Sequence, residues 1–230
     1  MSHPPTETTN SPWYRGPAFL LLVVLISVYA VSAFIGNEGL GAYLINALLM
    51  ASLLLGVRKI TRSPRALRVT LVIVLVGIVG QVLIQRLAER PAYLWNTWAN
   101  LVFFSAVLVF LVWSLFQAKR VDADTVFAAS SVFILLGIVC AFAFRLVYAA
   151  DSGAFSLNEQ DMADPAPALL HYSFTTLTTV GYGSISPMSD MARMISDLEA
   201  LTAQLYLAVI LARLVSLEIE NSRKKNGGES

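Results

Sequence analysis

The chain contains the sequence Thr-Thr-Val-Gly-Tyr-Gly at residues 178–183, whose residue types and spacing suit the binding of a dehydrated cation. A potassium ion without its water shell needs rings of oxygen atoms, and several copies of an extended backbone can supply them as carbonyl groups. We expect the carbonyls of Thr179, Val180, Gly181 and Tyr182 to be the K⁺ ligands, with the Thr179 hydroxyl at the inner end. Successive carbonyls can face one axis only if left-handed and right-handed backbone conformations alternate. Gly181 and Gly183 permit this alternation.

A short helix is expected immediately before this segment. Asp164 is a good N-cap, Pro165 suits the first helical position, and an apolar run follows at 166–177. The C-terminal end of such a helix carries a partial negative charge, which favours a cation nearby. The Val180 and Tyr182 side chains would point away from the axis along which the ions bind. There an aromatic neighbour such as Tyr172 can keep the ring of carbonyl oxygens at a fixed diameter.

Composition indicates a membrane protein, because 57% of the residues are hydrophobic and only 13% are charged. A helix needs about 20 apolar residues to cross the hydrocarbon core of a bilayer. Uncharged or nearly uncharged runs of about this length occur at 17–35, 41–57, 68–87, 97–117, 125–148 and 190–217. The polar stretch between the last two runs contains a short apolar segment, which indicates a re-entrant helix.

The predicted fold is therefore an all-α membrane protein with six transmembrane helices plus a re-entrant pore helix and a selectivity filter. The filter is the segment 179–183, which follows the pore helix. We expect four regions: an N-terminal tail at 1–16, a four-helix transmembrane bundle at 17–120, a pore domain at 121–218 and a C-terminal tail at 219–230. An alternative for the first run is a signal peptide, because Arg15 precedes it and Val31-Ser32-Ala33 resembles a cleavage site.

The basic residues predict the orientation, since Lys and Arg are retained on the cytoplasmic side of short loops. With both termini in the cytoplasm of a multi-pass protein of the cell (inner) membrane, most basic residues lie inside. These are Arg15, Arg58, Lys59, Arg62, Arg65, Arg68, Lys119, Arg120, Arg223, Lys224 and Lys225.

The segment from His171 to Leu177, the filter that follows it, Leu198-Glu199-Ala200 and the stretch from Gln204 to Ala208 resemble the bacterial potassium channel family. The resemblance extends over about 125–217, and over the first four helices it is a match in segment count to six-helix subunits. It implies a homotetramer with a two-helix pore domain that conducts K⁺ passively, without enzymatic activity. It also implies that Gln204, Leu207 and Leu211, with Thr178, line the pore; for Gln204 the alternative is a hydrogen bond between helices.

The sequence departs from this family pattern behind the filter. Many potassium channels follow the filter with Asp and some pair it with Glu in the short helix, whereas Ser184 and Thr175 stand here. Ala203 occupies the place where many inner helices keep a hinge glycine. We expect Thr175, Ser184 and Glu199 to support the filter, with Glu199 hydrogen-bonded to Thr175 or Thr176. The alternative is that Glu199 contacts a polar group of a neighbouring subunit or Arg145.

The first four helices lack the charges of a voltage sensor, because residues 97–117 contain no basic residue. Arg62, Arg65 and Arg68 have the spacing of a sensor, but cytoplasmic anchoring or contact with lipid headgroups explains them better. Acidic residues before the short helix would concentrate cations at an outer mouth, or are ordinary solvated loop charges. They are Asp151, Glu159, Asp161 and Asp164.

Other function classes find no support in the sequence. No catalytic carboxylate pair, phosphate-binding loop or metal-ligand cluster is visible, so no cofactor is expected beyond K⁺ as the permeant ion. A net charge of +1 gives no reason to expect nucleic acid, and Cys140 is interpreted as a small core residue. The expected partners are membrane lipid and three further copies of the chain. Two rivals remain: a subunit of an ion-coupled transporter, and a protein that retains a pore fold without conducting.

Overall fold

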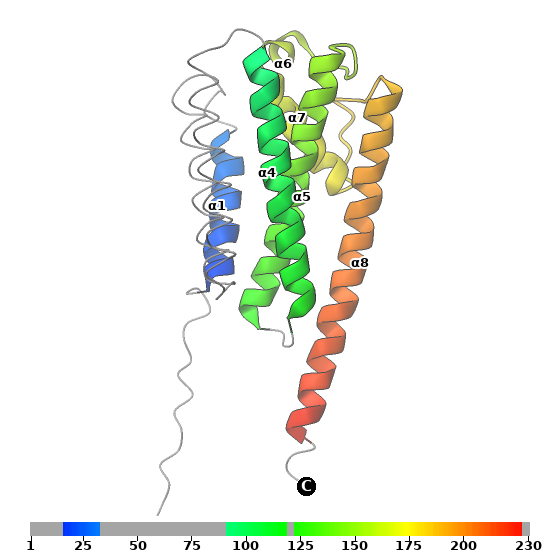
Figure 1. Cartoon of the computed structure of the whole chain (residues 1–230). Helices are drawn as coiled ribbons and strands as arrows, with labels where there is room; N and C mark the ends of the chain where they lie inside the picture. Colours follow the sequence, from blue (N-terminus) through cyan, green and yellow to red (C-terminus); the bar gives the residue numbers. More distant parts are fainter. Residues whose placement is uncertain (1–15, 33–90, 119–121, 227–230) are drawn as a thin grey trace, which may run out of the picture.

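The computed structural model describes residues 16–32, 91–118 and 122–226, and these residues fold into helices without a β-strand. Figure 1 shows their arrangement. The helices are α1 (Pro17–Ser32), α4 (Pro91–Gln117), α5 (Ala123–Ala150), α6 (Glu159–Ala163), α7 (Pro165–Leu177) and α8 (Asp190–Asn226).

Three of these helices are long and apolar enough to cross a membrane. They contain the spans Leu94–Gln117, Ala123–Ala150 and Asp190–Ile219, while α1 carries a shorter apolar stretch at Ala18–Ser27. These spans agree with the last three long apolar runs of the sequence. The second and third runs, together with Arg62, Arg65 and Arg68, lie outside the described residues.

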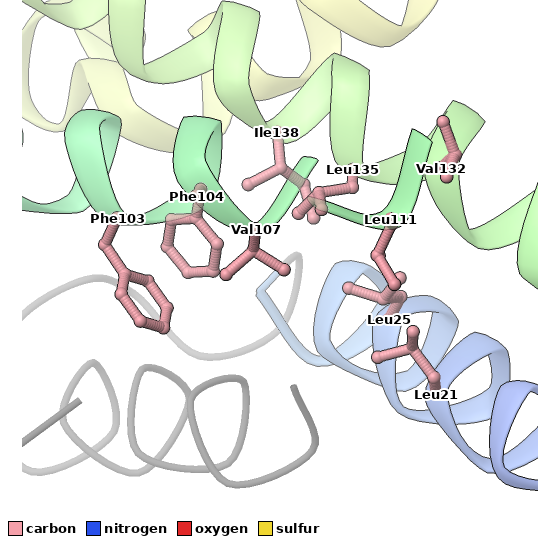
Figure 2. Close-up of a cluster of buried hydrophobic side chains, with 9 residues drawn as sticks. All are labelled: Leu21, Leu25, Phe103, Phe104, Val107, Leu111, Val132, Leu135 and Ile138. Carbon is pink, nitrogen blue, oxygen red and sulfur yellow. The ribbon is translucent and has the colours of Figure 1, made fainter. Parts of the chain in front are cut away.

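Helix α5 is the centre of the described structure, because α1, α4, α7 and α8 all pack against it (Figure 1). Its buried residues include Val132, Leu135 and Ile138, which meet buried side chains of α1 and α4 (Figure 2). The α1 and α4 members of this core are Leu21, Leu25, Phe103, Phe104, Val107 and Leu111. In a bilayer these side chains hold the helices together by close van der Waals packing, because lipid removes the hydrophobic driving force that acts in water.

Capping residues set where α5 and α7 begin. The Asp122 carboxylate accepts hydrogen bonds from the Thr125 amide at 2.8 Å and the Thr125 hydroxyl at 2.6 Å. The Asp164 carboxylate accepts one from the Ala166 amide at 3.4 Å, and Pro165 is the first residue of α7. The short helix therefore begins where the sequence predicted.

Helix α8 contacts α5 and α7 along one face only. Ala192, Ala203 and Ile210 on this face are buried, whereas most of its large apolar side chains are exposed in the subunit. The exposed ones include Leu198, Leu201, Leu205, Leu207, Leu211 and Val215. The helix continues without interruption through Ala203, the position at which the sequence offered no hinge glycine.

Candidate functional site: the segment between α7 and α8

The segment after α7 has a backbone that alternates in handedness. Thr179, Gly181 and Gly183 have positive φ angles of 59°, 55° and 78°. Val180 and Tyr182, which lie between them, are not among the described residues with positive φ. Glycine adopts such angles without penalty, but a β-branched residue such as Thr179 rarely does, so this conformation carries strain.

The amide groups of this segment are tied to the C-terminal end of α7. The Thr175 carbonyl accepts hydrogen bonds from the amides of Val180 at 2.9 Å and Gly181 at 3.2 Å. The Thr176 carbonyl accepts one from the Thr179 amide at 3.0 Å. Among the described residues, no hydrogen bond to the carbonyl oxygens of 179–183 is present. The amides are thus held by the helix, and the carbonyls are left available for another partner.

The whole segment from Thr178 to Ser184 is exposed at the surface of the chain. The exposed fraction reaches 53% for Val180 and 73% for Tyr182, both of them large apolar side chains. Exposed apolar side chains in a short, strained segment are typical of a binding surface.

Among the described residues of this chain, the aromatic neighbour of Tyr182 is His171. The two rings are stacked, with centroids 6.0 Å apart and an interplanar angle of 9°. Tyr172, named from the sequence as a candidate for this place, lies elsewhere. Its ring contacts Phe144 and Phe155, so the consecutive residues His171 and Tyr172 of α7 have different neighbours.

Two consecutive residues of α7 bind α8 through hydrogen bonds behind the segment. The hydroxyls of Tyr172 and Ser196 lie 2.6 Å apart, and the Ser173 hydroxyl lies 2.5 Å from Glu199 Oε1. Glu199 therefore reaches the short helix, but its partner is Ser173. The expectation of Thr175 or Thr176 was wrong, since the Thr175 hydroxyl donates to the Tyr172 carbonyl at 2.9 Å.

Of the two alternatives for Glu199, the contact with Arg145 is not found in the described part of the chain. Glu199 is 2% exposed in this chain, which leaves little of its surface for a contact with a second copy. The guanidinium of Arg145 lies over the Phe142 ring, 5.4 Å from its centroid. No ion pair between Glu199 and a basic side chain is present in the described part of the chain.

A second attachment holds the segment at its far end. The Ser156 amide donates to the Ser186 carbonyl at 2.9 Å, and the Ser186 amide donates to the Ser156 hydroxyl at 2.8 Å. Next to this pair, Phe155 and Pro187 form an isolated antiparallel bridge. The Met188 amide also donates to the Ala154 carbonyl at 2.8 Å. The loop after α5 therefore clips the chain between the segment and α8.

The remaining candidates from the sequence are placed as follows. The Thr178 hydroxyl donates to the Phe174 carbonyl at 2.6 Å, and Ser184 is exposed. No hydrogen bond joins Thr175 to Ser184 within the described ranges. Gln204, Leu207 and Leu211 are exposed along α8 at helical spacing, away from the contacts with α5 and α7.

Two of the acidic residues that precede the short helix have local structural roles. The Asp151 carboxylate accepts a hydrogen bond from the Gly153 amide at 2.9 Å, and Asp164 caps α7. In the residues that the structure describes, no group of three His, Cys, Asp or Glu side chains is placed to hold a metal ion.

The described residues define an all-helical membrane protein with a short helix and a strained extended segment between its last two long helices. Residues 144–219 match a protein-family model described as ion channel. The matched residues run from the end of α5 through the segment and most of α8, and the match supports an ion channel. Searches among curated proteins and among solved structures found no match.

Proposed function

We propose that this protein is a potassium-selective channel that conducts K⁺ passively through a homotetrameric pore in the cell (inner) membrane, with both termini cytoplasmic. The carbonyls of Thr179, Val180, Gly181 and Tyr182 are the proposed K⁺ ligands, and Gly183 closes the filter. No enzymatic step and no cofactor belong to this proposal, and K⁺ is its permeant ion.

One observation carries the proposal most strongly: the alternation of backbone handedness at Thr179, Gly181 and Gly183. Alternation turns successive carbonyls toward the same side of an extended chain, and one strand of such carbonyls is a fraction of an oxygen ring. The amides of Val180 and Gly181 are held by α7, which sets the direction of the Thr179 and Val180 carbonyls in the same peptide groups. A strained Thr179 fits a backbone whose shape is set by ion binding.

A symmetric assembly would complete the oxygen rings to which this strand contributes. One subunit contributes one strand, and closed rotational symmetry is the usual way to complete a ring from identical parts. The exposed segment at 178–184 and the uncovered apolar face of α8 are surfaces that such an assembly would cover. In this assembly, Thr178, Gln204, Leu207 and Leu211 are the proposed pore-lining residues below the filter, and lipid covers the outer helices.

Conventional voltage gating is not part of the proposal. Helix α4 contains no charged residue along Pro91–Gln117. Charges inside the membrane field are what couple a protein to voltage, at about 2.3 kcal/mol per elementary charge per 100 mV.

The direct test uses the purified protein in liposomes loaded with K⁺ or with Na⁺. We expect K⁺ flux down its gradient without an added energy source and much slower Na⁺ flux. Flux that requires a second ion gradient would favour the ion-coupled transporter, and the absence of flux from folded tetramers would favour the non-conducting protein. Cross-linking in mild detergent should proceed to tetramers, and a product that stops at dimers contradicts the assembly.

A further inference from the structure

The Ser173 hydroxyl has two hydrogen-bond partners but only one proton to donate. Its oxygen lies 2.7 Å from the Gly137 carbonyl and 2.5 Å from Glu199 Oε1. A serine hydroxyl has one proton to donate, while a carbonyl and an ionised carboxylate can only accept. Both short contacts are ordinary hydrogen bonds only if the second proton resides on Glu199.

The surroundings of Glu199 also disfavour a negative charge. The side chain is 2% exposed, and its second oxygen, Oε2, has no hydrogen-bond partner among the described residues. A buried carboxylate without a cation and with one oxygen unsatisfied is costly, whereas the neutral acid avoids most of that cost. If Glu199 were ionised and the Ser173 proton were shared with the Gly137 carbonyl, the carboxylate would be stabilised even less.

The groups that face Glu199 do not change this conclusion. On α5 the neighbouring group is the Cys140 thiol, which is uncharged and can donate only a weak hydrogen bond to the Glu199 carboxyl group. On α7 it is Tyr172, whose hydroxyl is engaged with Ser196. On α8 itself, Asp197 is exposed and of the same charge sign. None of these groups is a cation.

We infer that Glu199 is held as a protonated carboxylic acid, which donates to the Ser173 hydroxyl while this hydroxyl donates to the Gly137 carbonyl. One chain of hydrogen bonds thus joins α8, α7 and α5 behind the filter. Glu199 is thus a positioning residue for the filter's helix. When Glu199 loses its proton to water, Ser173 turns its only proton from the Gly137 carbonyl to the carboxylate. Ionisation therefore breaks the hydrogen bond between α7 and α5 at Gly137. Alkaline conditions should then make α7, which holds the filter amides, less firmly fixed.

Infrared spectroscopy tests the protonation without relying on conduction. The purified wild-type protein at neutral pH should show a carboxylic-acid C=O stretching band that is absent from Glu199→Gln. The matched control is Asp197→Asn, which removes an exposed acid two residues away and should keep the band. Ser173→Ala should shift the band, because the acid loses its hydrogen-bond acceptor. A wild-type spectrum without a band that depends on Glu199 overturns the inference.

Flux in liposomes tests the positioning role, and this second part rests on the proposed channel function. We expect wild-type flux to be lost at alkaline pH in step with the infrared band, and Glu199→Gln, which cannot ionise, to keep its flux over the same range. Asp197→Asn should behave as wild type. A band that titrates while wild-type flux stays constant overturns the positioning role. Absence of flux from every variant, with the band intact, would instead contradict the channel function.

Discussion

The imidazole of His171 is stacked on the phenol of Tyr182, with ring centroids 6.0 Å apart and planes within 9° of each other. His171 lies in α7, and Tyr182 lies in the strained segment that α7 precedes. This ring pair joins the outer part of the segment to the helix, in addition to the amide hydrogen bonds at its beginning.

Replacing His171 should therefore weaken the outer part of the filter. His171→Ala removes the stacked ring, a contact worth about 0.5–1.5 kcal/mol in aromatic pairs, and we expect faster loss of K⁺ conduction during sustained activity. His171→Phe keeps a flat ring and is the matched control, which should retain most of the conduction. The measurement is single-channel recording in planar bilayers. Equal behaviour of the two variants would show that stacking has no part in filter stability.

Gly181→Ala should abolish K⁺ conduction. A Cβ at Gly181 meets no atom of the subunit within 4 Å, so the cost is not a clash inside the subunit. The cost is conformational, because an L-residue in the left-handed region is disfavoured by about 1–2 kcal/mol, repeated in every subunit. Gly153→Ala, in the loop after α5, is the matched control and should conduct normally. Selective K⁺ flux through Gly181→Ala would refute the filter assignment.

Gly137→Ala should push α5 and α7 apart. A Cβ there would lie 3.2 Å from Leu177 Cδ2 and 3.3 Å from Phe174 Cζ, which is tighter than ordinary contact. Overpacking of this kind costs about 1–3 kcal/mol, and we expect a lower midpoint of thermal unfolding in detergent. Gly153→Ala is the comparison, because its Cβ would lie 3.3 Å from the carboxylate oxygen of Asp151, an exposed side chain that can move aside. An unchanged midpoint for Gly137→Ala would mean that the two side chains move aside without cost.

Arg213 should anchor the lower part of α8 to the end of α4. One nitrogen of its guanidinium donates to the Phe116 carbonyl at 2.7 Å and to the Ala118 carbonyl at 3.0 Å, and the group lies over the Phe116 ring. A cation at a helix C-terminus is worth about 0.3–1 kcal/mol, more where it is partly buried. Arg213→Gln should lower the thermal midpoint, and Arg213→Lys, which keeps the charge, should lower it less. The reverse order would exclude a role for the charge.

The conductance of the channel should depend only weakly on voltage. Because α4 has no charged residue, the described helices offer no stripe of charge to move through the field. The apparent gating charge, measured from conductance against voltage in solutions free of divalent cations and polyamines, should stay well below that of a voltage-gated channel. A value of several elementary charges per channel would contradict this expectation.

The sequence predicted the features that depend on local chemistry. The start of α7 follows from Asp164 and Pro165, and the positive φ angles of Gly181 and Gly183 follow from their lack of a side chain. The positive φ of Thr179 did not follow, because its residue type argues against it.

Features that depend on how helices are rotated could not be predicted in the same way. Adjacent residues of an α-helix point about 100° apart, so the expectation that Glu199 would meet Thr175 or Thr176 missed its partner Ser173 although it named the right helix. The same ambiguity placed Tyr172 where His171 stands. The clip between Ser156 and Ser186 joins residues 30 positions apart and leaves no local pattern in the sequence.

The unpaired carbonyls of 179–183 have a consequence for the filter's own integrity. Backbone oxygens enclosed away from water need partners, and this subunit supplies none for them among its described residues. In the proposed pore the permeating ions are those partners, so they serve as structural ligands as well as cargo. The conformation of the filter then depends on the K⁺ concentration of the surrounding solution. Depletion of K⁺ should collapse the strand, and restored K⁺ should rebuild it.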